Sequence, residues 1–234
     1  VLQRNAYNMC KGSFGGFNGT GLPHEYICVQ SMDGMLSIFE YESFSISCFL
    51  PKALIPGPLK YVAKTDSFVT VGSSWELESY KYQVLATSAK SFERTGNEQN
   101  KQKKILPEFT YNLGEAALDI EVVVNSEQNV YSILVLGERN LYCLSDTGAL
   151  KFMRKFDFSP SCFCAYTIQP SASNPNAGSS INYLVATHSK VLLVQEDVRV
   201  KWAAQLDNVP VQMKVARIND LNGCIVTLSE DGQL

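Results

Sequence analysis

Hairpin-like patterns recur along this chain at a nearly constant interval, and this repetition constrains the fold more than any other feature of the sequence. Each pattern has two short apolar runs, rich in Val, Ile, Leu, Tyr and Phe, on either side of a polar turn. Five such turns are centred on Asp33, Ser74, Glu138, His188 and Asp231. Successive turns are 41, 64, 50 and 43 residues apart.

The two longer intervals contain polar segments without an apolar period, at 87–104 and 170–180. Without these insertions, the intervals shorten to about 46 and 39 residues. A repeat of about 40–45 residues that contains four strands is typical of a propeller blade. Helical periodicity is nearly absent elsewhere, so the sequence predicts an all-β fold.

Further apolar runs lie where the remaining strands of each blade are needed. Candidate inner strands precede the later hairpins at 59–63, 118–124, 162–168 and 211–218. Candidate outer strands follow two hairpins, at 149–156 and 198–206. Each outer run has a large aromatic residue directly after a lysine, Phe152 and Trp202, and we expect these rings to pack between blades.

The predicted architecture is a WD40-like β-propeller, of which this chain supplies about four and a half blades. Residues 1–234 would form part of one propeller domain, with variable loops near 86–107 and 170–181. A ring needs about four to eight complete blades to bury its sheet faces. Because the fifth hairpin reaches Leu234 as its third strand would begin, we expect a piece of a longer propeller.

Composition and charge exclude several classes of protein. Hydrophobic residues make up 45% of the chain and charged residues 18%, which indicates a folded domain with a sizeable core. The net charge of −3 lacks the basic excess that is typical of nucleic-acid binders. No apolar stretch approaches the ~20 residues of a membrane helix, and no secretory signal pattern is present at the beginning.

Cysteine usage points to a reducing compartment. The seven cysteines include no Cys-x-x-Cys pair, so neither a zinc ribbon nor a thioredoxin-like motif is expected. Most lie inside apolar runs, where free cysteine is a common small core residue. They are Cys10, Cys28, Cys48, Cys143, Cys162, Cys164 and Cys224.

Motifs that would indicate catalysis are absent from the sequence. The two histidines, His24 and His188, lie in expected turns, and no P-loop, nucleophile elbow, zincin or dinucleotide motif occurs. The glycine-rich stretch at 11–16 lacks the Gly-Lys-Ser/Thr ending that binds phosphate, so we interpret it as a strand end beside a turn. Glu40 and Glu42 are better explained as solvated edge charges than as a glycosidase pair. We therefore expect no enzymatic activity, cofactor or metal.

One insertion carries a local charge bias. Its five basic residues outnumber Glu93 and Glu98 by three charges. A flexible basic segment can gain about 1 kcal/mol per positive charge near an anionic membrane. The insertion is therefore a candidate contact for lipid or a partner, and the alternative is a solvated loop. The basic residues are Lys90, Arg94, Lys101, Lys103 and Lys104.

Several continuous segments of the sequence are similar to those of a known protein family. The most distinctive is Val-Leu-Gly-Glu-Arg-Asn at 135–140, and others lie at 31–36, 49–51, 56–59, 78–85, 114–120, 158–163, 201–206 and 225–232. In these segments, the chain resembles the Bardet–Biedl syndrome protein 9 family, also called parathyroid-hormone-responsive protein. The resemblance does not extend to the insertions at 86–104 and 170–181, which we interpret as variable loops.

The resemblance implies an N-terminal seven-bladed propeller followed by an ear-like β-sandwich and further domains. It also implies a core subunit of the BBSome, an eight-subunit coat-like complex that moves membrane proteins into and out of cilia. An Arf-like small GTPase recruits that complex to membranes. The family has no catalytic residues to transfer to this chain.

The resulting expectation is a non-enzymatic scaffold that binds other BBSome subunits and, indirectly, an Arf-like GTPase and ciliary membrane cargo. Its expected location is the cytoplasm, the cilium and ciliary membrane, the basal body and the centriolar region. One alternative is a generic propeller module of another vesicle coat or trafficking complex. Another is a propeller hydrolase or sugar binder, but the expected inner strands carry only Asp119, Glu121 and Lys214 as charged residues.

Overall fold

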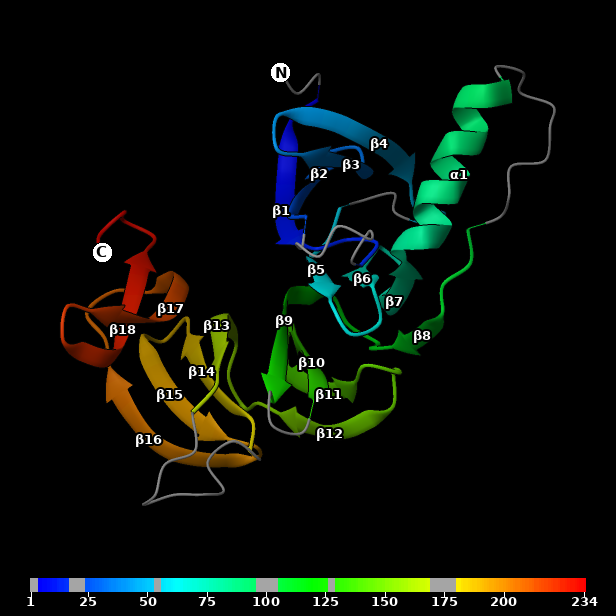
Figure 1. Ribbon diagram of the computed structural model, residues 1–234. Helices are drawn as coiled ribbons and strands as arrows, with labels where there is room; N and C mark the ends of the chain where they lie inside the picture. The colour runs from blue at the N-terminus through cyan, green and yellow to red at the C-terminus, as the bar shows by residue number, and fades with distance from the viewer. Residues whose placement is uncertain (1–3, 17–23, 53–55, 96–104, 126–128, 169–179) are drawn as a thin grey trace. The chain divides into compact units, whose positions relative to one another are not determined.

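A computed structural model describes residues 4–16, 24–52, 56–95, 105–125, 129–168 and 180–234, with side chains of the one helix described only through residue 89. Within these residues, the strands form four four-stranded sheets and one two-stranded sheet (Figure 1). Consecutive strands pair antiparallel in every sheet. Four of the hairpins that the sequence predicts are therefore confirmed, those centred on Asp33, Ser74, Glu138 and His188, while the turn at Asp231 follows β18 (Leu221–Ser229) with no strand after it among the described residues.

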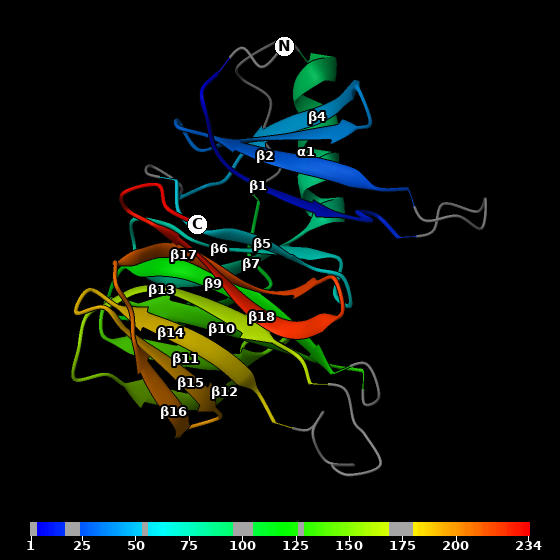
Figure 2. The same cartoon turned by 90° about the vertical axis from the view of Figure 1, so that its left-hand side faces the viewer.

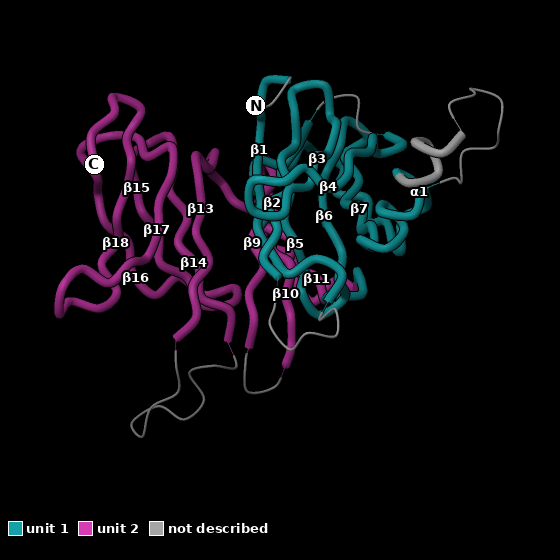
Figure 3. The backbone as a smooth tube through the Cα atoms, turned by 45° about the horizontal axis from the view of Figure 1, so that its top comes forward, with its two compact units in different colours: residues 1–120, 146–148 teal, residues 121–145, 149–234 magenta. Residues whose placement is uncertain are grey.

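The chain divides into two compact units, residues 1–120 with 146–148, and residues 121–145 with 149–234 (Figure 3). The prediction that residues 1–234 belong to one propeller domain stays a prediction. The first unit contains the first and second sheets. Their strands are β1 (Ala6–Gly12), β2 (Tyr26–Ser31), β3 (Met35–Glu40), β4 (Ser43–Phe49), β5 (Leu59–Val62), β6 (Ser67–Val71), β7 (Glu76–Lys81) and β8 (Phe109–Asn112).

The third sheet begins in the first unit, and the rest of it lies in the second unit with the fourth and fifth sheets. The third consists of β9 (Ala117–Asn125), β10 (Val130–Gly137), β11 (Asn140–Ser145) and β12 (Leu150–Lys155). The fourth consists of β13 (Pro160–Tyr166), β14 (Asn182–Thr187), β15 (Val191–Glu196) and β16 (Arg199–Gln205). The fifth has β17 (Pro210–Ile218) and β18 (Leu221–Ser229).

An aromatic cluster forms the core of the first unit. Phe14, in the turn that follows β1, is 1% exposed and stacks on Tyr26 of β2 at 5.8 Å between ring centroids. It also meets Tyr61 of β5 and Phe68 of β6 edge-on, each at 4.7 Å. The glycine-rich stretch is confirmed as a strand end beside a turn, since β1 ends at Gly12 and a Cβ there would come 2.4 Å from the Tyr61 ring.

Residues 82–95 contradict the predicted loop. They form α1 (Tyr82–Thr95) between β7 and β8, and α1 packs against β4 and β7 (Figure 2). Leu85 and Ala89 are buried, while Tyr82 and Ala86 pack against the same core. These positions follow a helical i, i+3, i+4, i+7 pattern. This apolar face is short and directly follows β7 (Glu76–Lys81), so the helical period is hard to separate from that of the strand.

The core of the second unit is more uniform. Apolar residues of the third and fourth sheets and Met213 of β17 form one cluster, and every residue of β14 is buried. Such burial on both faces explains why β10 and β14 have continuous rather than alternating apolar sequences. Cys162 and Cys164, both on β13, belong to this cluster, as expected of small core residues. All seven cysteines are free thiols.

A β-bulge recurs at the same place in three outer strands. The extra residue is Ser45 in β4, Lys151 in β12 and Lys201 in β16, and each is followed by a large side chain opposite the fourth residue of the preceding strand. This shared register supports the equivalence of the sheets. Phe152 packs against the core as expected, but Trp202 is 47% exposed among the described residues, so the packing expected for it is not observed.

Candidate interaction surface

The basic insertion predicted from the sequence is only partly described. Lys90 and Arg94 lie four positions apart in the second half of α1, where the backbone is helical rather than a flexible loop. Lys101, Lys103 and Lys104 lie outside the described residues. The predicted contact with lipid or a partner therefore stays a prediction, although two of its five residues belong to a helix.

The candidate catalytic residues do not converge on a site. His24 pairs with Glu40, with 2.8 Å between Nδ1 and Oε1, and His188 lies in the turn between β14 and β15. Asp119 and Glu121 lie on β9, whereas Lys214 lies on β17 of another sheet. In the part of the chain that the structure describes, no three His, Cys, Asp or Glu residues are grouped to hold a metal ion.

Three large apolar side chains are exposed at the hairpin-turn end of the first unit. Met32 lies in the turn between β2 and β3, Phe49 ends β4, and Trp75 lies in the turn between β6 and β7. Their exposed fractions are 56%, 51% and 52%. We call Arg4, Met32, Phe49, Lys52 and Trp75 the hairpin-end surface.

Backbone constraints fix the turns that present this surface. In the first turn, Gly34 adopts a φ of +82°, and its N–H donates to the carbonyl of Ser31 at 2.9 Å. In the second, Trp75 itself has a φ of +59°, held by hydrogen bonds from its N–H to Gly72 and from the Leu113 N–H to its carbonyl. A bulky residue in this left-handed region costs about 1–2 kcal/mol relative to ordinary backbone, and such residues cluster at functional sites.

Contacts connect the exposed side chains. Arg4 forms an ion pair with Asp33, and its guanidinium lies over the Phe49 ring at 5.7 Å from the centroid. The N–H of Met32 donates to the Asn5 carbonyl at 2.9 Å. Lys52 Nζ lies 2.8 Å from Glu76 Oε2, next to Trp75 in sequence. The cations are thus already paired, which leaves the apolar groups as the part available to a partner.

Lys52 also links the surface to a buried carboxylate. Glu78 on β7 is 3% exposed, and its Oε1 lies 3.1 Å from Lys52 Nζ. The Tyr80 hydroxyl donates to Glu78 Oε2 at 2.7 Å. Burial, reinforced by this bond, raises the pKa of Tyr80. Hydrogen bonds to Glu76 and Glu78 raise the pKa of Lys52, and the bond to Lys52 lowers the pKa of Glu76.

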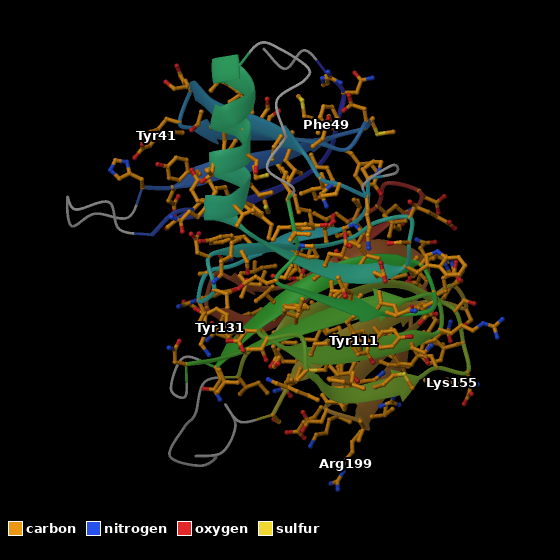
Figure 4. All side chains as sticks on the ribbon, turned by 90° about the vertical axis from the view of Figure 1, so that its right-hand side faces the viewer. Tyr41, Phe49, Tyr111, Tyr131, Lys155 and Arg199 are labelled. Atoms are coloured by element: carbon orange, nitrogen blue, oxygen red, sulfur yellow. The ribbon has the colours of Figure 1, made fainter. Side chains whose placement is uncertain are left out.

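The opposite end of the first sheet provides a contrast. Tyr41, in the turn between β3 and β4, is 75% exposed, and Figure 4 places it away from Phe49, at the other end of β4. Exposed aromatics and Met surrounded by paired charges are typical of the core of a protein–protein interface. The hairpin-end surface fits that description better than an isolated tyrosine does.

A second exposed surface runs along the outer strands β12 and β16 of the second unit. These strands contain no acidic residue, and Figure 4 shows Lys155 and Arg199 pointing into solvent. Arg154 Nη1 donates to the Val198 carbonyl at 2.6 Å, which connects one strand to the turn before the other. The basic residues are Lys151, Arg154, Lys155, Arg199 and Lys201.

Sequence reasoning missed both surfaces. The signal for the first was an apolar residue within each polar turn, Met32 beside Asp33-Gly34 and Trp75 beside Ser73-Ser74. The signal for the second was the lack of acids in two outer strands, but its cations alternate with apolar residues and do not form a run.

Comparison with known proteins identifies the family. The model of the PTHB1 N-terminal family matches residues 1–234. Protein PTHB1 of Xenopus laevis is 52% identical over 236 aligned residues, and Protein PTHB1 of Homo sapiens is 49% identical over the same length. The chain belongs to the PTHB1 family. It spans about a quarter of the length of these relatives, 26% and 25%, and 100% of it is covered.

Solved structures identify the fold of this PTHB1-family chain. BBS1N, in a crystal structure of its complex with ARL6DN, superposes with a TM-score of 0.65 and 13% identity, covering 100% of this chain and 66% of that one. The WD40 β-propeller domain of Doa1 gives 0.58 and 11%, covering 88% and 58%. At these identities the likeness concerns the fold alone. The predicted all-β, WD40-like propeller fold is confirmed.

For this PTHB1-family chain, the described residues include no helix that is both long and apolar enough to cross a bilayer.

Proposed function

We propose that this chain belongs to a non-enzymatic scaffold subunit of the BBSome, the coat-like complex that moves membrane proteins into and out of cilia. The observation that carries the proposal is its 52% and 49% identity to PTHB1 proteins along its full length. A propeller fold suits a scaffold because its turns and strand edges offer binding surfaces to several partners.

The proposed partners are other BBSome subunits and, indirectly, an Arf-like small GTPase and ciliary membrane cargo. The BBS1N chain, which has a similar fold, is bound to ARL6DN in its crystal structure. The complex was formed by BBS1N and not by this chain. It supports the proposal because it shows that a protein of this fold can bind a small GTPase. The proposed location is the cytoplasm, the cilium with its membrane, the basal body and the centriolar region.

We assign partner binding to the hairpin-end surface. Met32, Phe49 and Trp75 offer about half of their area to solvent while their charged neighbours are already paired. Burying such side chains in a partner gains free energy without the cost of breaking solvated charges. A few aromatic residues of this kind commonly supply most of the affinity of an interface.

Co-purification from ciliated cells tests the proposal. Full-length protein with Phe49→Ala and Trp75→Asn should recover other BBSome subunits about 10–30-fold less efficiently, the size expected when interface hot spots are lost. Asn is chosen because it tolerates the left-handed backbone of Trp75. Tyr41→Asn is the matched control, because Tyr41 is a more exposed aromatic at the opposite end of β4 and also has a left-handed φ of +51°, and it should leave recovery unchanged.

Two results would count against the proposal in different ways. Unmodified full-length protein that stays monomeric in ciliated-cell extracts would contradict scaffold function itself. Normal recovery with the double variant would contradict only the assignment of the surface.

A second candidate function is a propeller module of another vesicle coat or trafficking complex. The likeness to the Doa1 WD40 domain favours keeping it, since the same fold occurs there without sequence similarity. The location of the tagged full-length protein separates the two candidates, because only the first predicts enrichment at cilia and basal bodies.

A further inference from the structure

Three cysteines share one face of the first sheet. Cys10 lies on β1, Cys28 on β2 and Cys48 on β4, and all three belong to or pack against the core of the first unit. Cys28 is fully buried, whereas Cys10 and Cys48 are partly exposed. Neither the proposed scaffold function nor the fold requires a thiol at these positions, because any small apolar side chain would fill the same space.

Cys10 and Cys28 are direct partners in the antiparallel pairing of β1 with β2. Directly opposite residues in antiparallel strands have Cα atoms about 4.5 or 5.5 Å apart, depending on the hydrogen-bonding position. Both distances fall inside the range of about 4.4–6.8 Å that a disulfide requires. Because directly opposite residues of an antiparallel pair project to the same face with Cβ atoms about 4.5–5.5 Å apart, the two thiols are neighbours.

Cys48 does not meet this requirement. It pairs with Leu36 of β3, and Leu36 pairs with Gln30 of β2, so Cys48 is two strands away from Cys28 and offset along the sheet. Two strand spacings amount to about 9–10 Å, beyond the limit of about 7 Å for a disulfide without backbone movement. The geometry therefore selects one pair out of three neighbouring thiols.

From this geometry we propose that Cys10 and Cys28 form a reversible cross-strand disulfide, a thiol-redox site in the first sheet. Cys10 is the attacking thiol because it lies on the edge strand β1 and is partly exposed. Cys28 is the resolving thiol, buried behind it. Its interaction with Cys10, together with burial, raises the pKa of Cys28, which makes Cys28 a poor first nucleophile and agrees with this order.

The reaction needs a small-molecule disulfide such as oxidised glutathione. The Cys10 thiolate attacks one of its sulfur atoms, and a first glutathione leaves as thiolate. Cys28 then loses its proton, attacks the Cys10 sulfur of the mixed disulfide and releases the second glutathione. Two protein thiols are oxidised, one oxidised glutathione is reduced to two thiols, and reduced glutathione reverses both steps.

The expected consequence is a tighter first unit. The disulfide would close residues 10–28 into a covalent loop that contains Phe14, the centre of the aromatic cluster. A loop of this length restricts the unfolded chain, and the midpoint of thermal unfolding should rise by on the order of 5–10 °C.

The test exposes the full chain to glutathione buffers stepped from fully reduced to fully oxidised, followed by acid quenching and alkylation. Peptide mapping should show one cross-linked pair, Cys10 with Cys28, while the other five cysteines remain alkylated. Cys48→Ser should keep the cross-link, and Cys10→Ser should abolish it. Adding reduced glutathione should restore both thiols and the original unfolding midpoint.

Three outcomes would overturn the proposal. The first is full alkylation of Cys10 and Cys28 in the most oxidising buffer. The second is a glutathione adduct on Cys10 that persists without a cross-link, and the third is a cross-link that includes Cys48. The mapping of unmodified protein decides the matter even if a variant fails to fold.

Discussion

The second and fourth sheets each bury a tyrosine, but the groups that accept its hydroxyl hydrogen bond differ. In each, one central strand is buried along its whole length, β6 in the second sheet and β14 in the fourth, and both sheets place a buried tyrosine in that interior. In the second sheet Tyr80 donates to the carboxylate of Glu78, which Lys52 approaches from the hairpin-end surface. In the fourth sheet Tyr183 donates to the amide oxygen of Gln195 at 3.0 Å and to the Asp197 carbonyl at 2.6 Å.

The difference shows how a propeller blade can connect its interior to one surface. A buried carboxylate needs a cation, and that cation must come from a side chain long enough to retain contact with water. Lys52 fulfils this role and also contacts Glu76 beside Trp75, so the interior and the hairpin-end surface depend on the same residue. In the fourth sheet the acceptors of the Tyr183 hydroxyl are neutral, and the cation near that hydroxyl is Arg154 of β12, which opposes the rise in the pKa of Tyr183 that burial causes.

The largest expected effect concerns the approach to the second sheet. Gly57 packs so tightly that an added Cβ would lie 1.8 Å from the Val71 carbonyl oxygen, whereas the fourth sheet is approached through residues 156–159 without a glycine. Gly57→Ala should cost about 4–5 kcal/mol of unfolding free energy, since backbone of another strand must move. Gly114→Ala is the control. It has a φ of +73° but no atom within 4 Å, and should cost about 1 kcal/mol in urea unfolding.

The helix inserted after β7 distinguishes the second sheet further. Leu85 is fully buried in the core of the first unit, while its neighbour Val84 is 36% exposed. Leu85→Ala should therefore cost about 3 kcal/mol by leaving a cavity, and Val84→Ala about 0.5 kcal/mol or less. Equal effects in chemical denaturation would contradict the packing of α1.

Matched tyrosine substitutions compare the two interiors directly. Tyr80→Phe removes a hydrogen bond to a carboxylate and should cost about 1.5–3 kcal/mol, whereas Tyr183→Phe removes bonds to neutral acceptors and should cost about 0.5–1.5 kcal/mol. Both variants keep the ring and therefore the packing. A larger loss for Tyr183→Phe in urea unfolding would contradict the stronger bond that is assigned here to the carboxylate acceptor of Tyr80.

The smallest expected effect is a pH dependence at the surface. Bonding to Lys52 lowers the pKa of Glu76, and bonding to Lys201 and Ser180 lowers the pKa of Glu196. A lowered pKa in the folded state means that each contribution is complete above the ordinary value of 4.5 and is lost as pH falls through the lowered value. Lys52→Met and Lys201→Met should return the respective carboxylate pKa toward 4.5 in NMR titrations. An unchanged value would contradict that pair.

Most of the fold could be predicted because each hairpin is encoded locally. Runs such as 35–40 and 67–71 coincide with β3 and β6, since β-branched and aromatic residues bounded by turn residues leave little choice of structure. The helix α1 was missed because its apolar face, from Tyr82 to Ala89, is short and adjoins a strand with similar composition. The alternation of period 2 and the helical period overlap at that junction.

The candidate surface was less predictable for a physical reason. Met32, Phe49 and Trp75 are far apart in sequence, and only the pairing of strands and the bonds of Arg4 and Lys52 bring them to one end of the unit. The pairing of Cys10 with Cys28 likewise depends on register. Register depends on both strands of a pair, so the sequence of one strand alone does not determine which residues lie opposite each other.

The repeated bulges affect how readily the chain would aggregate at high protein concentration. Open edge strands can pair with the edge strands of other copies of the same chain and so cause aggregation. The extra residue in β4, β12 and β16 interrupts the flat ladder that another chain would need for docking, and lysine occupies that place twice. The bulges therefore disfavour the growth of fibres by edge-to-edge pairing at these three strands. The turns are not affected and can still contact specific partners.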